Sequence, residues 1–306
     1  MIREMKYKDI EAVNTLLAET FRDEYGHLNV DTEKRLVHMK RGYFIERVVS
    51  LLFTGYDKFL DFFVYEEEKS IRGCLRVMRL SEMTFYFATV AVDQNHTRRG
   101  IAFSLQEHCE ALCRKRGGKY ITLVIKEENV PSLQLVEKSG FTIYDENYMF
   151  ILDPLHYENK CVEGFRPLKR EDYTRIGELE KAIMSEEVVT IEGVLKYSLL
   201  NNLTSIFRYI LFGEKFFEYV FEKGDKITAY AKVSRFVDSS VSMILMVHGD
   251  SYSTLKDFTE KILYLHAQEK MRIIIGKDQL VERKILTELG FKEYSHLYAY
   301  YMKLRD

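Results

Sequence analysis

The spacing of hydrophobic residues changes from strand-like to helical between residues 85 and 105. From Phe85 to Val92 most positions are β-branched or aromatic, which predicts a strand. From Ile101 onward apolar residues recur at helical spacing, and this pattern ends at Gly117-Gly118. The basic turn Arg98-Arg99-Gly100 lies between the two patterns. The sequence therefore predicts a strand, a tight turn and a helix in succession.

Further elements are predicted on both sides of this unit. Two helical patterns follow Asp9, the second within 19–56, and a hairpin follows at 59–65 and 71–80. Downstream we expect a strand over 119–126, a helix capped by Asn129 and closed at Gly140, and a strand over 141–152.

The turn has the chemistry of an anion site. Backbone N–H groups at the start of a helix are unpaired and carry a partial positive charge. Gly100 has no Cβ, so a ligand can approach the backbone closely, and two arginines precede it. We therefore expect the amides of residues 98–103 to bind a phosphate.

Two motifs in this region resemble those of the GCN5-related N-acetyltransferase (GNAT) superfamily. Thr97-Arg98-Arg99-Gly100-Ile101-Ala102 resembles its acetyl-CoA motif Q/R-x-x-G-x-G/A, with Thr97 in place of the first Gln or Arg. The run Asn129–Phe141 resembles the later N-x-x-A/S-x-x-L-Y-E-K-x-G-F motif. Both occur in the expected order, and the resemblance covers residues 1 to about 152.

The resemblance implies an N-acetyltransferase that binds acetyl-CoA where the central strand and the strand over 119–126 splay apart. A main-chain N–H near Val90 or Val92 would stabilise the oxyanion. The residues implied in cofactor binding are Val90, Val92, Thr97, Arg98, Arg99, Gly100, Ile101, Ala102, Phe103, Asn129 and Ser132.

The acid and the base of such a reaction are harder to assign. Many members of the superfamily have a tyrosine acid where this chain has Val136, so Tyr144 is a candidate replacement. Tyr86 and Glu82 are candidate bases, each acting through water. With 21 tyrosines in the chain, a structural role for any one of them remains the alternative.

The acceptor groove is expected beside the first helix pair. The resemblance makes Glu24 and Tyr25 candidates for contact with the acceptor, together with Phe21 and His27. A surface loop is the alternative for this segment.

The second half repeats the first. Residues 165–172 match 2–9 in pattern, 215–220 match 58–63, and 288–291 match 138–141. We therefore predict two tandem GNAT-like domains, 1–153 and 154–306, each an α/β (α+β) unit with a mostly antiparallel twisted sheet flanked by helices. The second copy has no arginine in its turn and carries Asp250 there, which predicts a degenerate copy without cofactor. It would shape the groove or stabilise the first domain, and binding of a different ligand remains an alternative.

Composition excludes several classes of protein. The 306 residues carry a net charge of −2, and neither half has the basic excess of a nucleic-acid-binding surface. The N-terminus lacks a signal peptide, and no apolar run is long enough to span a bilayer. We expect a cytoplasmic monomer with reduced cysteines and no metal, in which Cys109 and Cys113 pack in the core.

Two classes of function therefore remain. One is an acetyltransferase that transfers an acetyl group to a primary amine, on a small molecule or a peptide, in the N-terminal domain. The other is a non-catalytic acetyl-CoA-binding or scaffolding protein, since Val136 replaces the usual acid. Loss of cofactor binding in both domains would follow if Thr97 impaired the motif.

Overall fold

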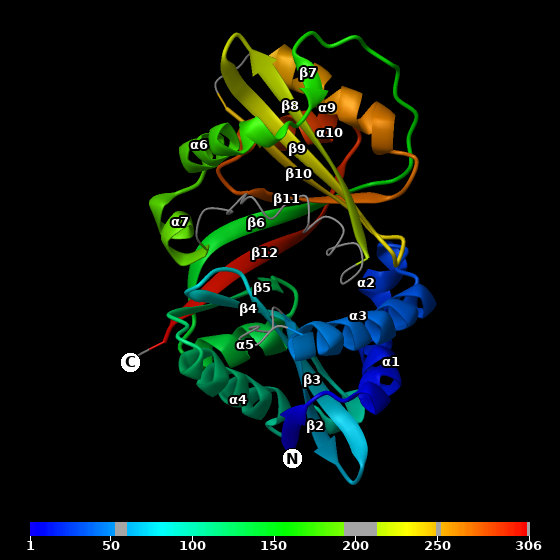
Figure 1. The fold of residues 1–306 in the computed structure, drawn as a ribbon, viewed down its shortest axis with the longest axis vertical. Coiled ribbons are helices and arrows are strands. Elements are labelled where there is room, and N and C mark those ends of the chain that lie inside the picture. The colour runs from blue at the N-terminus through cyan, green and yellow to red at the C-terminus, as the bar shows by residue number, and fades with distance from the viewer. Residues whose placement is uncertain (53–59, 193–212, 249–251, 305–306) are drawn as a thin grey trace.

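A computed structural model describes residues 1–52, 60–192, 213–248 and 252–304. Its strands form one twelve-stranded sheet in the order β1-β2-β3-β4-β5-β12-β6-β11-β10-β9-β8-β7 (Figure 1). Within this sheet the pairs β4–β5 and β10–β11 are parallel, and the other pairs are antiparallel. The predicted fold class, a mostly antiparallel sheet flanked by helices, is confirmed.

The first half follows the predicted order of elements. Its strands are β1 (Ile2–Glu4), β2 (Leu60–Glu67), β3 (Ser70–Arg79), β4 (Thr84–Val92), β5 (Tyr120–Lys126) and β6 (Thr142–Leu152). Its α-helices are α1 (Ile10–Thr20), α2 (Arg22–His27), α3 (Thr32–Leu52), α4 (Ile101–Lys115) and α5 (Val130–Lys138). Short 3₁₀ turns at Tyr7–Asp9 and Gln94–His96 precede α1 and α4.

The second half repeats this order. Its strands are β7 (Phe165–Pro167), β8 (Glu214–Lys223), β9 (Lys226–Phe236), β10 (Val241–Val247), β11 (Met271–Gly276) and β12 (Lys292–Lys303). Its α-helices are α6 (Tyr173–Ile183), α7 (Glu186–Glu192), α9 (Tyr252–His266) and α10 (Leu280–Glu288), and a 3₁₀ turn at Arg170–Asp172 precedes α6. Gly249, Asp250 and Ser251, on which the expected loss of the second cofactor site partly depends, lie outside the described residues.

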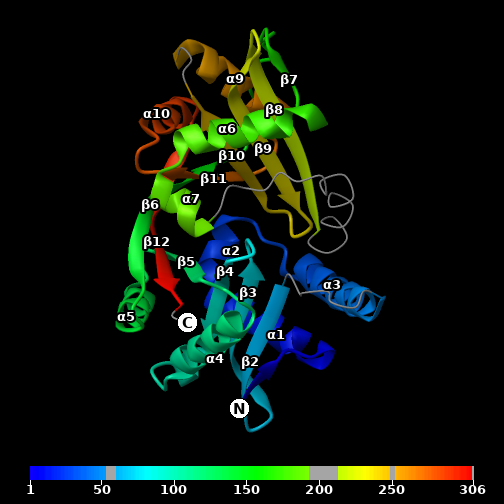
Figure 2. The ribbon, with the colours of Figure 1, turned by 60° about the vertical axis from the view of Figure 1, so that its left-hand side comes forward.

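The last strand of each half completes the sheet of the other half. β12 lies between β5 and β6, pairing antiparallel with both, and β6 pairs on its other side with β11 (Figures 1 and 2). Segments 1–153 and 154–306 are therefore joined through an exchanged pair of strands. The aromatic C-terminal strand is paired within the chain.

Helices cover both faces of the sheet in each half. In the first half, α4 and α5 cover a core that includes Leu75, Phe85 and Leu105. On the opposite face, α1 covers Val64, Cys74 and Ala91, and α3 packs beside it. Cys109 and Cys113 are buried in the core under α4, as predicted, and burial raises the pKa of both thiols.

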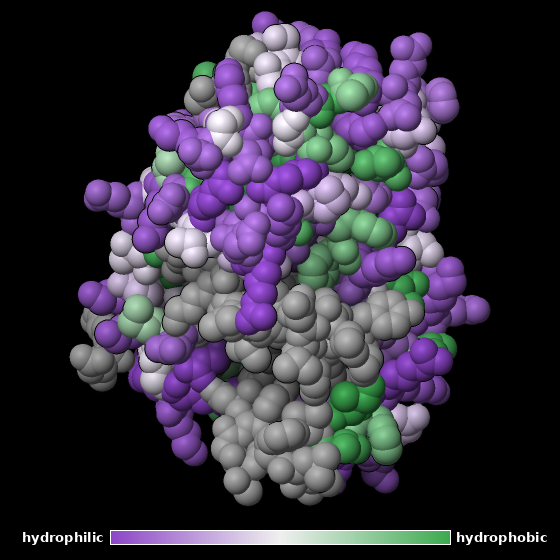
Figure 3. Space-filling view, turned by 45° about the horizontal axis from the view of Figure 1, so that its top comes forward, coloured by the Kyte–Doolittle hydropathy of each residue, from purple (hydrophilic) through white to green (hydrophobic). Residues whose placement is uncertain are grey.

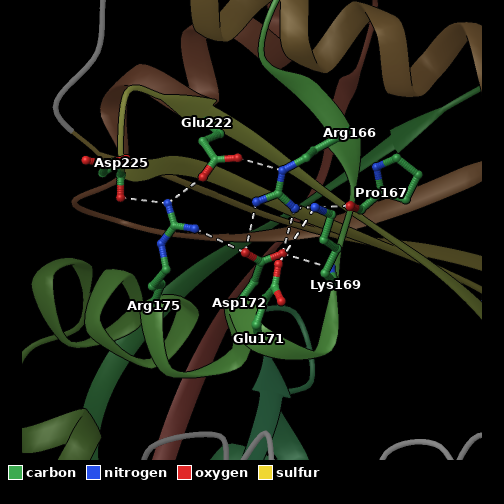
Figure 4. Close-up of polar contacts among 8 residues, drawn as sticks. All are labelled: Arg166, Pro167, Lys169, Glu171, Asp172, Arg175, Glu222 and Asp225. Carbon is green, nitrogen blue, oxygen red and sulfur yellow. Dashed lines mark hydrogen bonds and ion pairs between the residues drawn. The ribbon is translucent and has the colours of Figure 1, made fainter.

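A repeated ion-pair network confirms the internal repeat (Figure 4). Arg166 donates through Nη1 to Asp172 and through Nε to Glu222, both at 2.6 Å. In the first half Arg3 makes the same contacts with Asp9 and Glu66, at 2.6 and 2.7 Å. In each half the network links the first strand to the 3₁₀ turn before the first helix. It also links the first strand to the neighbouring strand, which is β2 in the first half and β8 in the second.

The surface in Figure 3 is mostly hydrophilic where it is described, with hydrophobic residues in small separate groups. Among the described residues, no helix is long and apolar enough to cross a membrane.

Candidate functional site

The two central strands of the first half separate after a short paired stretch. β4 and β5 pair only at Thr84–Tyr86 with Tyr120–Thr122, although β4 continues to Val92 and β5 to Lys126. A register shift between Arg76 and Val77 leaves Ala88 as the extra residue of β4 just beyond the last pair. The predicted splay of these strands is confirmed.

Main-chain polar groups of β4 face this splay. β3 pairs with one side of β4 as far as Val92, while on the other side no described strand pairs with β4 beyond Tyr86. Alternate N–H and C=O groups of a strand point to opposite sides, so some of those between 87 and 92 point toward the gap. Val90 is 37% exposed and Val92 is half-buried, so side chains on this part of β4 are accessible within the described part of the chain.

The turn that is expected to bind a phosphate, residues 98–103, lies beyond the carboxyl end of β4 and is called the Gly100 cradle. Gly100 is the N-cap of α4 with φ +77°, and Ser104 N donates to Gly100 O at 2.9 Å as the first bond of the helix. The amides of Ile101, Ala102 and Phe103 precede that bond and are the unpaired donors of the first turn. A Cβ built on Gly100 would have no atom within 4 Å, so there is open space beside Gly100.

Among the residues that the structure describes, the two arginine side chains of the turn are accessible to a ligand. Arg98 and Arg99 are exposed, and neither has an ion pair within the described part of the chain. The Thr97 hydroxyl donates to Gln94 O at 3.2 Å and so stabilises the preceding turn. Binding of a ligand by these residues stays a prediction.

Asp93 fixes the path of this turn. Its carboxylate accepts a hydrogen bond from Asn95 N at 2.9 Å and pairs with Arg72 at 2.8 Å. His96 Nδ1 lies 3.0 Å from the same carboxylate. The Asn95 amide and then the Arg72 guanidinium lower the pKa of Asp93, so the carboxylate remains charged and holds the turn in place.

A glycine that the sequence analysis missed sets the position of α4. A Cβ on Gly73 of β3 would lie 2.7 Å from Ile101 Cγ2 and 3.3 Å from Ala91 O. The helix start therefore packs directly on the strand backbone. Gly73 pairs with Val92, so this close contact occurs at the same end of the splay as the cradle.

The second motif lies at the same edge of the sheet. Asn129 caps α5, since its Oδ1 accepts from Ser132 N at 3.3 Å. Because β4 and β5 are parallel, their carboxyl ends lead into the Gly100 turn and the Asn129 cap side by side. The structure therefore brings the two cofactor motifs to one end of the splay.

The two positions considered for the acid, 136 and 144, lie in different parts of the first half. Val136 is 4% exposed and packs in the core under α4 and α5, so the position lacks a proton donor. Tyr144 lies on β6, which β12 separates from β5, and its ring meets that of Tyr301 edge-on at 5.9 Å. Its role as the acid stays a prediction.

The candidate bases lie at the paired end of the splay. Tyr86 is the last β4 residue that pairs with β5, on the sheet face opposite Phe85 and Phe87. Glu82 is exposed in the turn before β4, and its carbonyl oxygen accepts from Arg79. The structure brings Tyr86, and not Glu82, to the mouth of the splay.

The candidate groove residues form a short helix rather than a loop. Glu24 and Tyr25 lie on α2, and Glu24 pairs with Lys126 at the end of β5 at 3.0 Å. Arg35 of α3 stands over the Tyr25 ring at 4.4 Å. Both residues therefore lie over the α1/α3 face of the sheet, near the open end of β5.

In the second half, a buried carboxylate lies at the end of the splay between β10 and β11. β10 and β11 also pair at only three positions, Val241–Met243 with Met271–Ile273. Here, however, the carboxylate of Glu282 on α10 is close enough to the last β10 residue that the Val247 backbone partly offsets the rise in the pKa of Glu282. Glu282 is 4% exposed, and burial raises its pKa. In the first half the corresponding third residue of the helix is Ser132.

The comparisons with known proteins agree with this geometry. Residues 11–141 match the model of the acetyltransferase (GNAT) family. No curated protein sequence matches the chain significantly. Among solved structures, a tandem GNAT protein from the clavulanic acid biosynthesis pathway, solved without acetyl-CoA, is 17% identical, with a TM-score of 0.67 over 100% of this chain and 99% of that one.

A second solved structure extends the likeness. A GCN5-related N-acetyltransferase from Sphaerobacter thermophilus is 10% identical, with a TM-score of 0.66 over 100% of this chain and 96% of that one. At such identities these structures establish a shared fold. Residues 11–141 therefore match the acetyltransferase (GNAT) family model, and the whole chain has the fold of a tandem GNAT protein.

Proposed function

We propose that the first half binds acetyl-CoA in the β4–β5 splay and transfers its acetyl group to a primary amine. The open splay that ends at the Gly100 cradle carries this proposal. The pyrophosphate would bind the amides of residues 101–103 and the side chains of Arg98 and Arg99. The thioester would lie along the open edge of β4, where a main-chain N–H between 87 and 92 stabilises the oxyanion.

The second half serves in this proposal as a degenerate copy without cofactor. The buried Glu282 carboxylate lies near Val247 at the end of this splay. A second anion at this position would be repelled. A single cofactor site in the first half is therefore expected.

Titration of acetyl-CoA into the wild-type protein, Gly100→Glu and Gly117→Glu tests the site. Both glycines have φ +77° and no atom within 4 Å of an added Cβ, and they flank the two ends of α4. The two variants therefore carry similar backbone strain, but only Gly100→Glu places a carboxylate in front of the cradle.

We expect one equivalent bound by wild type and Gly117→Glu, and an affinity lower by about 100-fold or more for Gly100→Glu. Equal binding by all three proteins would place the site elsewhere. Absence of binding by the wild type would refute the proposed function.

A non-catalytic acetyl-CoA-binding protein is the second candidate. The burial of Val136 supports it, because no phenol is available there to protonate the leaving thiolate. Release of free CoA, measured with and without added amines, separates the two. An enzyme accelerates the release when an acceptor is present, whereas a binding protein does not.

A further inference from the structure

A half-buried arginine, Arg76, lies beside the splay on the α1/α3 face of the sheet. Along β3, Leu75 and Val77 point into the core under α4, and Cys74 points into the core under α1. Arg76 therefore points to the α1/α3 side. Its cross-strand neighbours are Phe62 and Thr89.

No acidic side chain of the described residues pairs with this guanidinium. Its Nε atom is buried without a hydrogen bond, and its ring contact is with Phe62, 5.7 Å from the ring centroid. The phenols of Tyr25 and Tyr86 lie within electrostatic range. Burial lowers the pKa of Arg76, but a guanidinium remains charged at neutral pH, so this cation has no counter-charge among the described residues.

The equivalent position of the second half also carries a cation, Lys232, and this cation has an acidic partner. Lys232 of β9 pairs with Ile244 of β10, in the register that Arg76 and Thr89 have in the first half. Its ammonium also contacts an aromatic ring, that of Phe216, at 4.7 Å. Lys232 in addition lies 3.5 Å from the carboxylate of Glu214, which is 5% exposed. The aromatic contact occurs in both halves, but among the described residues the anion is found only in the second half.

The position of Arg76 fits a ligand that reaches the splay. Thr89 lies three residues beyond the last β4–β5 pair, on the open part of β4, and Arg76 is opposite it on the neighbouring strand. Neighbouring strands are about 4.8 Å apart, so the backbone of Arg76 lies about one strand spacing from the open part of β4. A small molecule over this face can contact Arg76 and the splay at once.

We propose that Arg76 binds a carboxylate of the acceptor, and that the acceptor is therefore an amino-acid-like molecule carrying both an amine and a carboxylate. This inference rests on the proposed function. The single positive charge of the guanidinium would be balanced by one monoanion. Its planar group can donate two parallel hydrogen bonds to a carboxylate. Arg76 would thus act as a specificity-determining residue on the face covered by Tyr25.

The first test needs no substrate. Thermal unfolding is measured for the ligand-free wild type, Arg76→Met and Lys232→Met. Removing this half-buried cation should leave the unfolding midpoint of Arg76→Met equal to or above that of the wild type. Lys232→Met leaves Glu214 buried without its cation, so its midpoint should fall. A comparable fall for Arg76→Met would show that Arg76 has a structural partner and would overturn the proposal.

The second test measures acetylation of the L-amino acids and of their carboxamides, which keep the amine and lose the carboxylate. In the wild type at least one amino acid should exceed its carboxamide in kcat/KM by about 30-fold or more. Arg76→Met should lose this preference while binding acetyl-CoA normally, and Arg76→Lys should keep part of it. Equal use of acids and carboxamides by the wild type would overturn the proposal.

Failure of the proposed function is recognised separately. If acetyl-CoA binds but no amine is acetylated, the catalytic proposal fails, and the carboxylate site is then tested by unfolding of the CoA-saturated protein. Amino acids should raise the midpoint of the wild type more than their carboxamides do, and this difference should vanish in Arg76→Met. If no amino acid raises the wild-type midpoint, the carboxylate site is refuted as well.

Discussion

His266, the last residue of α9, is a buried neutral histidine. It is 5% exposed, and its Nε2 lies 2.9 Å from the Tyr219 hydroxyl. Burial, and then the nearby charge of Arg235, lower its pKa from 6.5 to about 4. Because the folded state resists protonation of His266, the stability it contributes is complete above pH 6.5 and is lost as the pH falls toward 4.

We therefore predict that His266→Gln weakens the dependence of stability on pH between 6.5 and 4. The pKa difference corresponds to roughly 3 kcal/mol of unfolding free energy over this range. Denaturant unfolding at several pH values checks this, with the exposed His248→Gln as the control. The difference between variants is the useful quantity, because Glu282, whose pKa is raised, contributes with the opposite sign. Identical profiles for His266→Gln and wild type would contradict the prediction.

Residues with a local backbone role could be identified from the sequence, whereas those defined by tertiary neighbours could not. Gly100 and Asn129 were recognised because a left-handed residue before a helix and an N-cap depend on a few adjacent positions. Arg76 was not identified from the sequence, because the environment of its side chain is set by Phe62 and Thr89 on neighbouring strands. A cation on an inward-facing position of an apolar strand was the available signal.

At the scale of elements, the start of α4 is positioned by its contact with β3. Gly73 makes this close approach possible, since an added Cβ would meet Ile101 and Leu105 at 2.7 and 3.2 Å. In the second half the equivalent partner of Val247 is Ala229, which already carries a Cβ. The packing of helix on strand therefore differs between the halves at the residue beneath the cradle.

We predict that Gly73→Ala moves the start of α4 and lowers both stability and acetyl-CoA affinity. Overpacking of this kind costs about 1–3 kcal/mol. Unfolding midpoints and titration with acetyl-CoA provide the measurements. Ala229→Gly is the matched control and should leave acetyl-CoA affinity unchanged. Undiminished affinity of Gly73→Ala would show that the helix start tolerates displacement.

Most elements of the first half follow from periodicity, and the exceptions have a common cause. The helix α2 was expected as a connection, because its six residues Arg22–His27 are too few for a helical pattern and include Gly26. Tertiary contacts hold it in place, among them the pairing of Glu24 with Lys126 and the contact of His27 with Tyr294. These partners are more than 100 residues away in the sequence.

At the scale of the molecule, the exchanged strands join the two halves into one sheet. β6 and β12 have the same place in the repeat and similar patterns, so the sequence does not show which of them pairs with β5. Two interlocked copies and two separate copies would have the same element order. Because β12 is already paired within the chain, we propose that the 306-residue chain is a monomer.

We predict that fragment 1–153 dimerises by mutual strand exchange. Without β12, the edge of β5 is open, and β6 from a second copy is the available equivalent strand. Light scattering on the purified fragment measures this, with the full chain expected to be monomeric. Fragment 1–140, which also lacks β6, is the control and should not form this dimer. A folded, monomeric fragment 1–153 would refute the prediction.

The position of β12 has a consequence during protein synthesis. The strand that covers β5 is made long after β5 itself, so the ribosome must add the 165 residues between Lys126 and Lys292 before the first sheet can close. At typical elongation rates this takes on the order of 10 to 30 s, during which a chaperone could bind the uncovered edge. A premature stop codon that removes only the final strand would therefore disrupt the part of the molecule that is made first.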